Sequence, residues 1–182
     1  MYKKQTLAVL LLGFASLTYA SPEIIAHRGG TGDAPENTVV AINKALQNNA
    51  DTVWLTVQLS KDGIPVLYRP SNLNVLTNYT GSVSDFTAGQ LAAADAGYYF
   101  GKPDFPYRNK GISIPTLESI LTKWKEVNFF LDIKSPDAAP DKLAKALEKV
   151  LRDTKSLQRT RVYSTDEKYL NALPKDIQRF VS

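Results

Sequence analysis

The sequence contains no cysteine, and only one histidine occurs among its 182 residues. The absence of cysteine excludes disulfide bonds, thiolate metal sites and lipid anchors attached to cysteine. The formal charge of +4 is small, and the chain has no block of basic residues of the kind that nucleic-acid-binding proteins carry. The composition therefore indicates an ordinary globular domain with no nucleic-acid partner, and nothing in it points to a specific protein partner.

Long hydrophobic runs are also absent, apart from one at the N-terminus. The basic residues of "MYKK" precede "TLAVLLLGFASL", an apolar run of about a dozen residues that is too short to cross a bilayer. "TYA", which ends at Ala20, fits the small-x-small pattern of a cleavage site. We therefore expect a signal peptide over residues 1–20, no membrane span, and an exported protein that is periplasmic or secreted. The remaining domain, residues 21–182, is nearly neutral.

Strands and helices are expected to alternate along this domain. Residue patterns predict strands at 23–27, 51–59, 64–69, 129–134, 160–165 and 178–182. Apolar residues at helical spacing predict helices at 38–49, 87–96, 116–127, 137–154 and 166–173. A Lys-Asp-Gly turn at 61–63 adds one hairpin step. This order of elements is typical of parallel β/α architecture.

The strand at 51–59 divides its side chains between two faces. Four aliphatic side chains share the face that should pack against helices: Val53, Leu55, Val57 and Leu59. Three others share the face that should point into a barrel or toward its mouth: Trp54, Thr56 and Gln58. The same alternation directs Phe130, Asp132 and Lys134 inward. Parallel β/α folds keep their active sites at the carboxyl ends of such strands.

Six motifs follow one another between residue 24 and the C-terminus. They are "HRGGTGDAPENT" (27–38), "ADTVWLTVQLSKDGIPVLYRP" (50–70), "TGSVSDFTAGQL" (80–91), "IPTLESIL" (114–121), "FFLDIKS" (129–135) and "VYSTDEKYL" (162–170). In this order they resemble the glycerophosphodiester phosphodiesterase family, whose members share a TIM-like (β/α) barrel with other phospholipase-C-like phosphodiesterases. The resemblance implies a phosphoric diester hydrolase of glycerophospholipid metabolism.

The resemblance also implies roles for individual residues. The family uses a divalent cation, Ca²⁺ or Mg²⁺, held by carboxylates, together with two histidines and an arginine that binds the phosphate. His27 matches the first histidine and would act as the general base, and Arg28 matches the phosphate-binding arginine. Glu36 and Asn37 would line the substrate site, and Lys134 matches the family's lysine.

Several family positions carry residues of different chemistry. Trp54 and Thr56 stand where the family has two of its three metal carboxylates. Neither replaces a carboxylate, because an indole offers only an N–H donor and a neutral hydroxyl is a weak ligand. Asp132 keeps the third position, with a side chain one methylene shorter, and Arg69 stands at the second histidine. We therefore expect no tightly bound cation and weak or lost hydrolysis.

Two residues leave alternatives open. Arg69 either binds the phosphate together with Lys134, or fills the vacated histidine position and pairs with Asp132 or Glu36. Arginine supplies the positive charge in metal-free phosphatidylinositol-specific phospholipases C of similar fold, but a guanidinium does not release a proton near neutral pH and cannot act as general acid. Trp54 is expected to plug the barrel mouth, or alternatively to stack on a ligand.

The number of predicted elements is small for a complete barrel. A (β/α)₈ barrel usually needs about 200 residues or more, and this sequence predicts about six or seven strands. We expect an incomplete barrel that lacks the C-terminal β/α units. Three interpretations follow: an impaired phosphodiesterase, a non-catalytic pseudoenzyme that binds a small phosphodiester or phosphate anion, or a truncated remnant.

Overall fold

The computed structural model describes residues 22–180, so the predicted signal peptide at 1–20 lies outside the described residues. The strands are β1 (Ile25–His27), β2 (Thr52–Leu59), β3 (Pro65–Leu67), β4 (Asn128–Ile133) and β5 (Thr160–Tyr163). The helices are α1 (Val39–Gln47), α2 (Ala88–Ala92), α3 (Leu117–Lys123), α4 (Pro140–Asp153) and α5 (Glu167–Asn171). No helix in the described range is long and apolar enough to cross a membrane.

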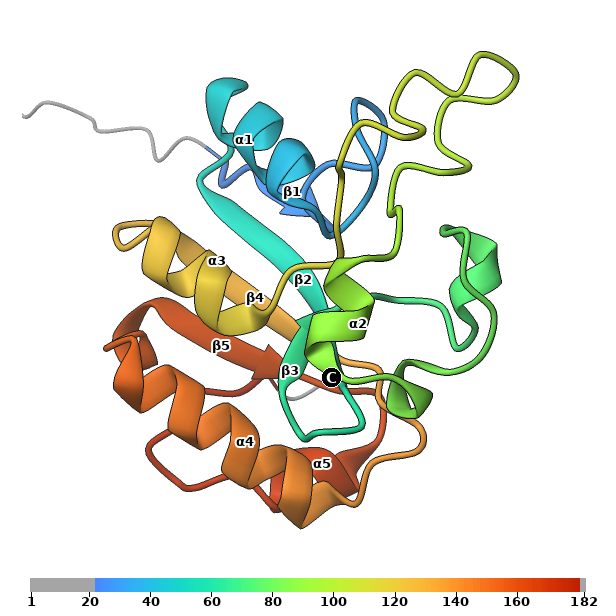
Figure 1. Ribbon diagram of the computed structural model, residues 1–182. Helices are drawn as coiled ribbons and strands as arrows, with labels where there is room; N and C mark the ends of the chain where they lie inside the picture. The colour runs from blue at the N-terminus through green and yellow to red at the C-terminus, as the bar shows by residue number, and fades with distance from the viewer. Residues whose placement is uncertain (1–21, 181–182) are drawn as a thin grey trace, which may run out of the picture.

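The strands form one five-stranded sheet with the order β1-β2-β4-β5, and β3 pairs with β2 (Figure 1). All pairs along this path are parallel, whereas β3 is antiparallel to β2. Within residues 22–180 no strand joins β5 to β1. The sheet is therefore open, as the expected incomplete β/α barrel requires.

Side-chain caps set the start of α1 and α3 where the sequence predicts these helices. Thr38 accepts a hydrogen bond from the backbone N–H of Ala41 at the start of α1, and Thr116 caps α3 in the same way. Helix α2 begins at Ala88, after its cap Thr87, but it ends at Ala92 rather than at residue 96. The chain leaves the helix there because the N–H of Ala96 donates to the carbonyl of Ile112 and anchors the following loop.

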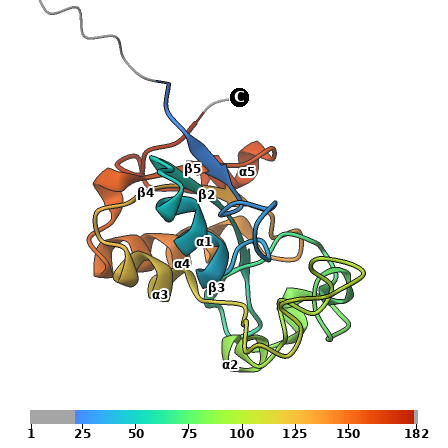
Figure 2. The same cartoon turned by 90° about the horizontal axis from the view of Figure 1, so that it is seen from above.

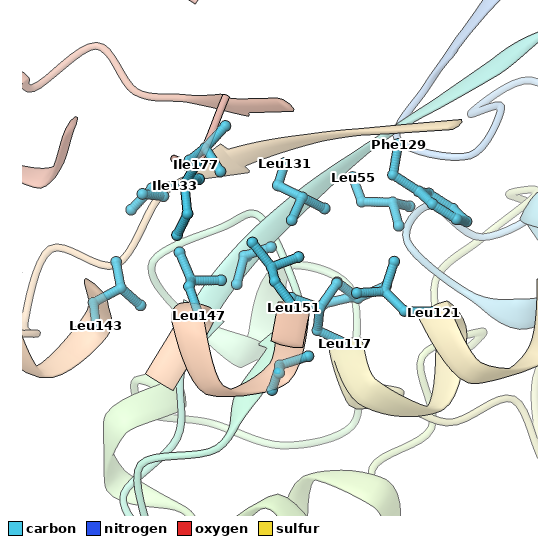
Figure 3. Packing of buried hydrophobic residues seen from close by; sticks show 14 of the residues in the cluster. Leu55, Leu117, Leu121, Phe129, Leu131, Ile133, Leu143, Leu147, Leu151 and Ile177 are labelled. Atoms are coloured by element: carbon cyan, nitrogen blue, oxygen red, sulfur yellow. The ribbon is translucent and has the colours of Figure 1, made fainter. Parts of the chain in front are cut away.

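The main core lies between the sheet and the helices. Leu55, Phe129, Leu131 and Ile133 of β2 and β4 contribute the sheet side of this core, as Figure 3 shows. The helical side consists of Leu117 and Leu121 of α3 with Leu143, Leu147 and Leu151 of α4. Val53, Leu55 and Val57 are fully buried, which confirms the predicted division of β2 into two faces.

A second, smaller core packs beneath the long segment that follows β3. Its members are Val66, Tyr68, Leu73, Val83, Leu91, Ala94, Ala96 and Ile114. Figure 2 shows α2 and the neighbouring loops projecting on one side of the sheet. This segment is therefore anchored by its own apolar contacts and stands next to the strand ends that carry the candidate site.

The last predicted strand, at 178–182, is only partly formed in the described residues. Arg179 makes a single parallel bridge with Val162 of β5. The N–H of Val162 donates to the carbonyl of Gln178, and the N–H of Phe180 donates back to Val162. The sheet therefore continues past β5 in the parallel sense by one bridge.

Candidate functional site

The predicted site residues lie on or beside the sheet face that points away from the main core. In register, His27 of β1 stands next to Trp54 of β2, which stands next to Phe130 of β4. One step toward the carboxyl ends, Thr56 stands next to Asp132. The sheet thus brings together, on adjacent strands, residues that are far apart in the sequence.

The loop after β1 forms the first half of the site. Arg28 Nη1 donates a hydrogen bond of 2.9 Å to Glu36 Oε2, and both side chains are mostly buried. The N–H of Asn37 donates to the carbonyl of Arg28, which closes the loop. Arg28 and Asn37 both have positive φ angles, 53° and 59°, a conformation that costs free energy for residues other than glycine. The loop is thus held in a strained conformation that fixes the guanidinium.

Asn37 also ties this loop to the sheet. Its Oδ1 accepts a 2.8 Å hydrogen bond from the N–H of Thr56, and only 2% of Asn37 is exposed. Asn37 therefore positions the loop that carries Arg28 and Glu36, and the next residue, Thr38, caps α1.

The ends of β4 and β5 form the second half. Asp132 Oδ1 lies 3.1 Å from Lys134 Nζ, and Lys134 Nζ donates to Thr165 Oγ1 at 3.2 Å. Lys134 and Arg69 both line a cavity of about 280 Å³ at the carboxyl ends of β4 and β5. Two cationic side chains thus face one cavity.

Arg69 forms no ion pair among residues 22–180. This bears on whether Arg69 pairs with a carboxylate or is available to bind a phosphate. Glu36 is paired with Arg28, and Asp132 is paired with Lys134. The two carboxylates that could have neutralised Arg69 are therefore paired elsewhere. The structure leaves the exposed Arg69 guanidinium available to an anion.

Gln58 is a site residue to which the sequence analysis assigned no role. Its Nε2 donates to the carbonyls of Tyr68 and Pro70, each at 2.9 Å, and only 3% of Gln58 is exposed. These bonds fix the backbone on both sides of Arg69. The alternation along β2 had placed Gln58 on the inner face, but its contact with the segment after β3 depends on tertiary structure. Beside it, burial raises the pKa of the Tyr68 hydroxyl well above its ordinary value.

Trp54 stands at the centre of an aromatic group on the inner face. Its ring meets those of His27, Phe130 and Tyr163 edge to face, with centroids 6.1, 6.0 and 5.5 Å apart. Phe180 continues the group, 4.5 Å from Phe130. Such contacts fix the orientation of the indole, and Trp54 therefore occupies the space between the two halves of the site.

The donor set does not suit the divalent cation that the family uses. No group of three or more histidine, aspartate or glutamate side chains in residues 22–180 is arranged to hold a metal. Trp54 presents an N–H, which repels a cation, and Thr56 presents a neutral hydroxyl. Asp132 beside Lys134 and Glu36 beside Arg28 are already charge-compensated. The residues present therefore do not fit a family-type metal centre.

The fold and the site together give the class of this protein. It is an incomplete parallel β/α barrel with basic side chains at the carboxyl ends of its strands. Residues 27–174 match the model of the glycerophosphoryl diester phosphodiesterase family. The chain belongs to the glycerophosphodiester phosphodiesterase family.

Curated relatives agree with this assignment. The uncharacterized protein Rv2277c of Mycobacterium tuberculosis is 45% identical over 149 residues, which cover 80% of this chain and 49% of that protein. The glycerophosphodiester phosphodiesterase of Bacillus subtilis is 35% identical, covering 69% of this chain and 45% of the enzyme. The chain thus spans about half the length of the curated relatives it matches.

Solved structures show the same fold. The glycerophosphoryl diester phosphodiesterase domain of Rv2277c has a TM-score of 0.81 and 40% identity, covering 90% of this chain and 60% of that domain's chain. A phosphodiesterase of Oleispira antarctica, solved with the product sn-glycerol-3-phosphate, has a TM-score of 0.74 and 27% identity, covering 83% and 60%. The open sheet described above is therefore part of the family's TIM-like barrel.

Proposed function

We propose that this domain binds a glycerophosphodiester or its phosphate product and that its hydrolytic activity is weak or lost. The observation that carries the proposal is the composition of the inner face. Trp54 and Thr56, which the family resemblance aligns with two metal carboxylates, lie in register with Phe130 and Asp132, between an arginine held by Glu36 and the cavity lined by Arg69 and Lys134. The side chains that would bind the phosphate are present, whereas the carboxylates that would hold a divalent cation are replaced.

The retained side chains are suited to a phosphate. Guanidinium groups bind phosphate oxygens through paired hydrogen bonds, and lysine contributes a point charge. Arg28 is oriented by Glu36, Arg69 is fixed through its backbone by Gln58, and Lys134 is held by Thr165. The product found in the Oleispira antarctica enzyme supports a phosphate of this kind as the ligand.

General acid–base chemistry has less support. His27 is exposed and touches Trp54 at the ring edge, and Arg69, at the second histidine position, releases no proton near neutral pH. His27 can accept a proton from an attacking hydroxyl, but the leaving alcohol has no donor of suitable pKa among these residues. Hydrolysis would then lack its second proton transfer.

Calorimetric titration with inorganic phosphate and with sn-glycerol 3-phosphate tests the binding. We expect Arg69→Gln and Lys134→Gln each to weaken binding by about ten- to a hundredfold, because a hydrogen bond to a charged group contributes about 1.5–3 kcal/mol. Arg161→Gln is the matched control, since this exposed arginine lies toward the amino end of β5. Equal affinities in all three variants would contradict the anion site.

The loss of hydrolysis has a separate test. The protein is incubated with glycerophosphocholine in Mg²⁺, in Ca²⁺ and in EDTA, and glycerol 3-phosphate release is measured. We expect release no faster than in a His27→Ala variant under every condition. Metal-stimulated release that His27→Ala abolishes would show instead that the domain is an active phosphodiesterase.

We also propose export, on the basis of the N-terminal sequence alone. The basic start, the short apolar run and the small residues ending at Ala20 are the features of a secretory signal. A periplasmic or secreted location would place the domain near glycerophosphodiesters outside the cytoplasm. Fractionation of cells that express the full chain tests this, and a cytoplasmic, uncleaved product would contradict it.

A further inference from the structure

We propose that the vacated metal position binds the hydroxyl groups of a neutral polyol without a cation. Five buried side-chain polar atoms in residues 22–180 have no hydrogen-bond partner: Glu36 Oε1, Asn37 Nδ2, Trp54 Nε1, Thr56 Oγ1 and Asp132 Oδ1, the last of which keeps only its ion pair with Lys134. A buried polar atom without a partner costs about 1–3 kcal/mol. In a folded protein, such atoms usually mark a place for water, an ion or a ligand.

These five atoms belong to one place in the fold. Glu36 and Asn37 are neighbours in the loop, and the Asn37 side chain already contacts the backbone of Thr56. Trp54 and Thr56 share the inner face of β2, and Asp132 is the register partner of Thr56 on β4. The residues that carry the unpartnered atoms thus lie together, as one polar cluster, on one loop and two adjacent strands, between the two halves of the anion site.

The chemistry of the cluster selects the ligand. Asn37 and Trp54 present N–H donors, which exclude a metal ion from the position that they face. The carboxylate oxygens of Glu36 and Asp132 repel a second anion. Thr56 both donates and accepts. A ligand that satisfies all of them must also donate and accept, and a pair of alcohol hydroxyls does both while carrying no charge.

Two cavities flank the cluster. Glu36 lines one of about 370 Å³, together with Tyr99 and Phe100. Lys134 lines the other, of about 280 Å³. The unpartnered atoms are themselves closed to solvent, so a ligand must displace a covering side chain. Lys134 can supply this movement, because its side chain is 25% exposed and its departure from the ion pair would free Asp132 Oδ1 for the ligand.

The inference rests on the proposed function in one respect: the phosphate group of the ligand must bind at the anion site so that its attached polyol reaches the cluster. Two phosphate esters of equal charge separate the two ideas. sn-Glycerol 3-phosphate has two free hydroxyls, and propyl phosphate has none. Both are titrated calorimetrically in EDTA. We expect the glycerol ester to bind about tenfold more tightly, because two net hydrogen bonds of about 0.5–1.5 kcal/mol each correspond to that ratio.

Two substitutions locate the effect, and a third serves as control. Thr56→Val removes a hydroxyl with little change of shape, and Trp54→Phe removes the indole N–H together with one ring; we expect each to lower the ratio to about threefold or less. Thr52→Val makes the same change on the same strand, at its amino end, where the hydroxyl bonds Glu23. This variant should keep the full ratio.

Several results would overturn the inference. They are a ratio near one in the unmodified protein, a ratio that requires Mg²⁺ or Ca²⁺, and a ratio that neither Thr56→Val nor Trp54→Phe lowers. If neither ester binds, the proposed function fails by itself. Saturation-transfer NMR with glycerol against 1-propanol then tests the cluster directly: glycerol-selective transfer that Thr56→Val removes supports the inference, and equal signals contradict it.

Discussion

At the scale of the residue, the candidate site depends on side chains that hold backbone in place. Asn37 adopts a left-handed conformation and accepts from the N–H of Thr56, so one side chain sets both the strained loop and its attachment to β2. Gln58 does the equivalent for the segment around Arg69. Asn37 and Gln58 supply no acid, base or charge to the site, yet both determine where its cationic groups lie.

Replacing Asn37 should therefore be costly. We expect Asn37→Ala to lower the free energy of unfolding by about 1–3 kcal/mol through the unpaired N–H of Thr56, with a further penalty of about 1 kcal/mol or more because alanine is disfavoured at positive φ. Urea denaturation measures the change.

The matched control for this substitution is Asn49→Ala. Asn49 follows α1, also has a positive φ of 61°, and is exposed. Asn49→Ala should therefore lose only the free energy that alanine costs at a positive φ angle. If both variants lose the same stability, the bond from Asn37 to Thr56 contributes nothing, and the loop is held by other contacts.

At the scale of the element, the sequence predicted the β/α order because each signal was local. Thr38 and Thr116 cap helices immediately before apolar residues at helical spacing, and the alternation along β2 separated Val53 and Leu55 from Trp54. The early end of α2 depends on a hydrogen bond from Ala96 to Ile112 across the loop. A pattern within one segment carries no signal for such a bond.

Arg159 joins three elements in a way that its local sequence also conceals. Its guanidinium donates to the carbonyls of Leu121, Trp124 and Val127, which connect α3 to β4, from a position just before β5. Burial lowers the pKa of this guanidinium from its ordinary value. The three carbonyls accept from a charged group and stand near the end of α3, where cations are favourable.

We predict that Arg159→Met destabilises the fold by about 2–3 kcal/mol, because several carbonyls lose a charged donor. Thermal and urea unfolding of purified variants measure this. Arg161→Met is the control, since the exposed Arg161 guanidinium donates to Gln178 alone within residues 22–180 and its loss should change stability little. Equal losses in the two variants would show that the three carbonyl contacts are not stabilising.

At the scale of the whole molecule, the family and the open barrel could be inferred from ordered motifs, because HRG, PENT, KDG and IPTLE keep the spacing of one architecture. The pairing of charged side chains within the site could not be inferred from the sequence. Arg69 was equally compatible with a carboxylate partner and with a free guanidinium. Only the three-dimensional structure shows that Glu36 and Asp132 are paired with Arg28 and Lys134.

The open sheet has a consequence for association. β1 is an edge strand in the described residues, and Ile24 and Ile25 beside it are 53% and 39% exposed. Unpaired backbone groups and apolar side chains at such an edge promote pairing with another chain, and a charged residue there opposes it. We therefore predict that the protein self-associates in a concentration-dependent manner and that Ile25→Lys shifts it toward the monomer.

Sedimentation velocity at several concentrations measures this shift. Ile64→Lys is the control, because Ile64 lies in the turn between β2 and β3 and is 37% exposed, close to the exposure of Ile25. It adds the same charge away from the β1 edge, so it should leave the association unchanged. A monomer at all concentrations would contradict the prediction, and an equal shift in both variants would mean that net charge, rather than the β1 edge, controls association.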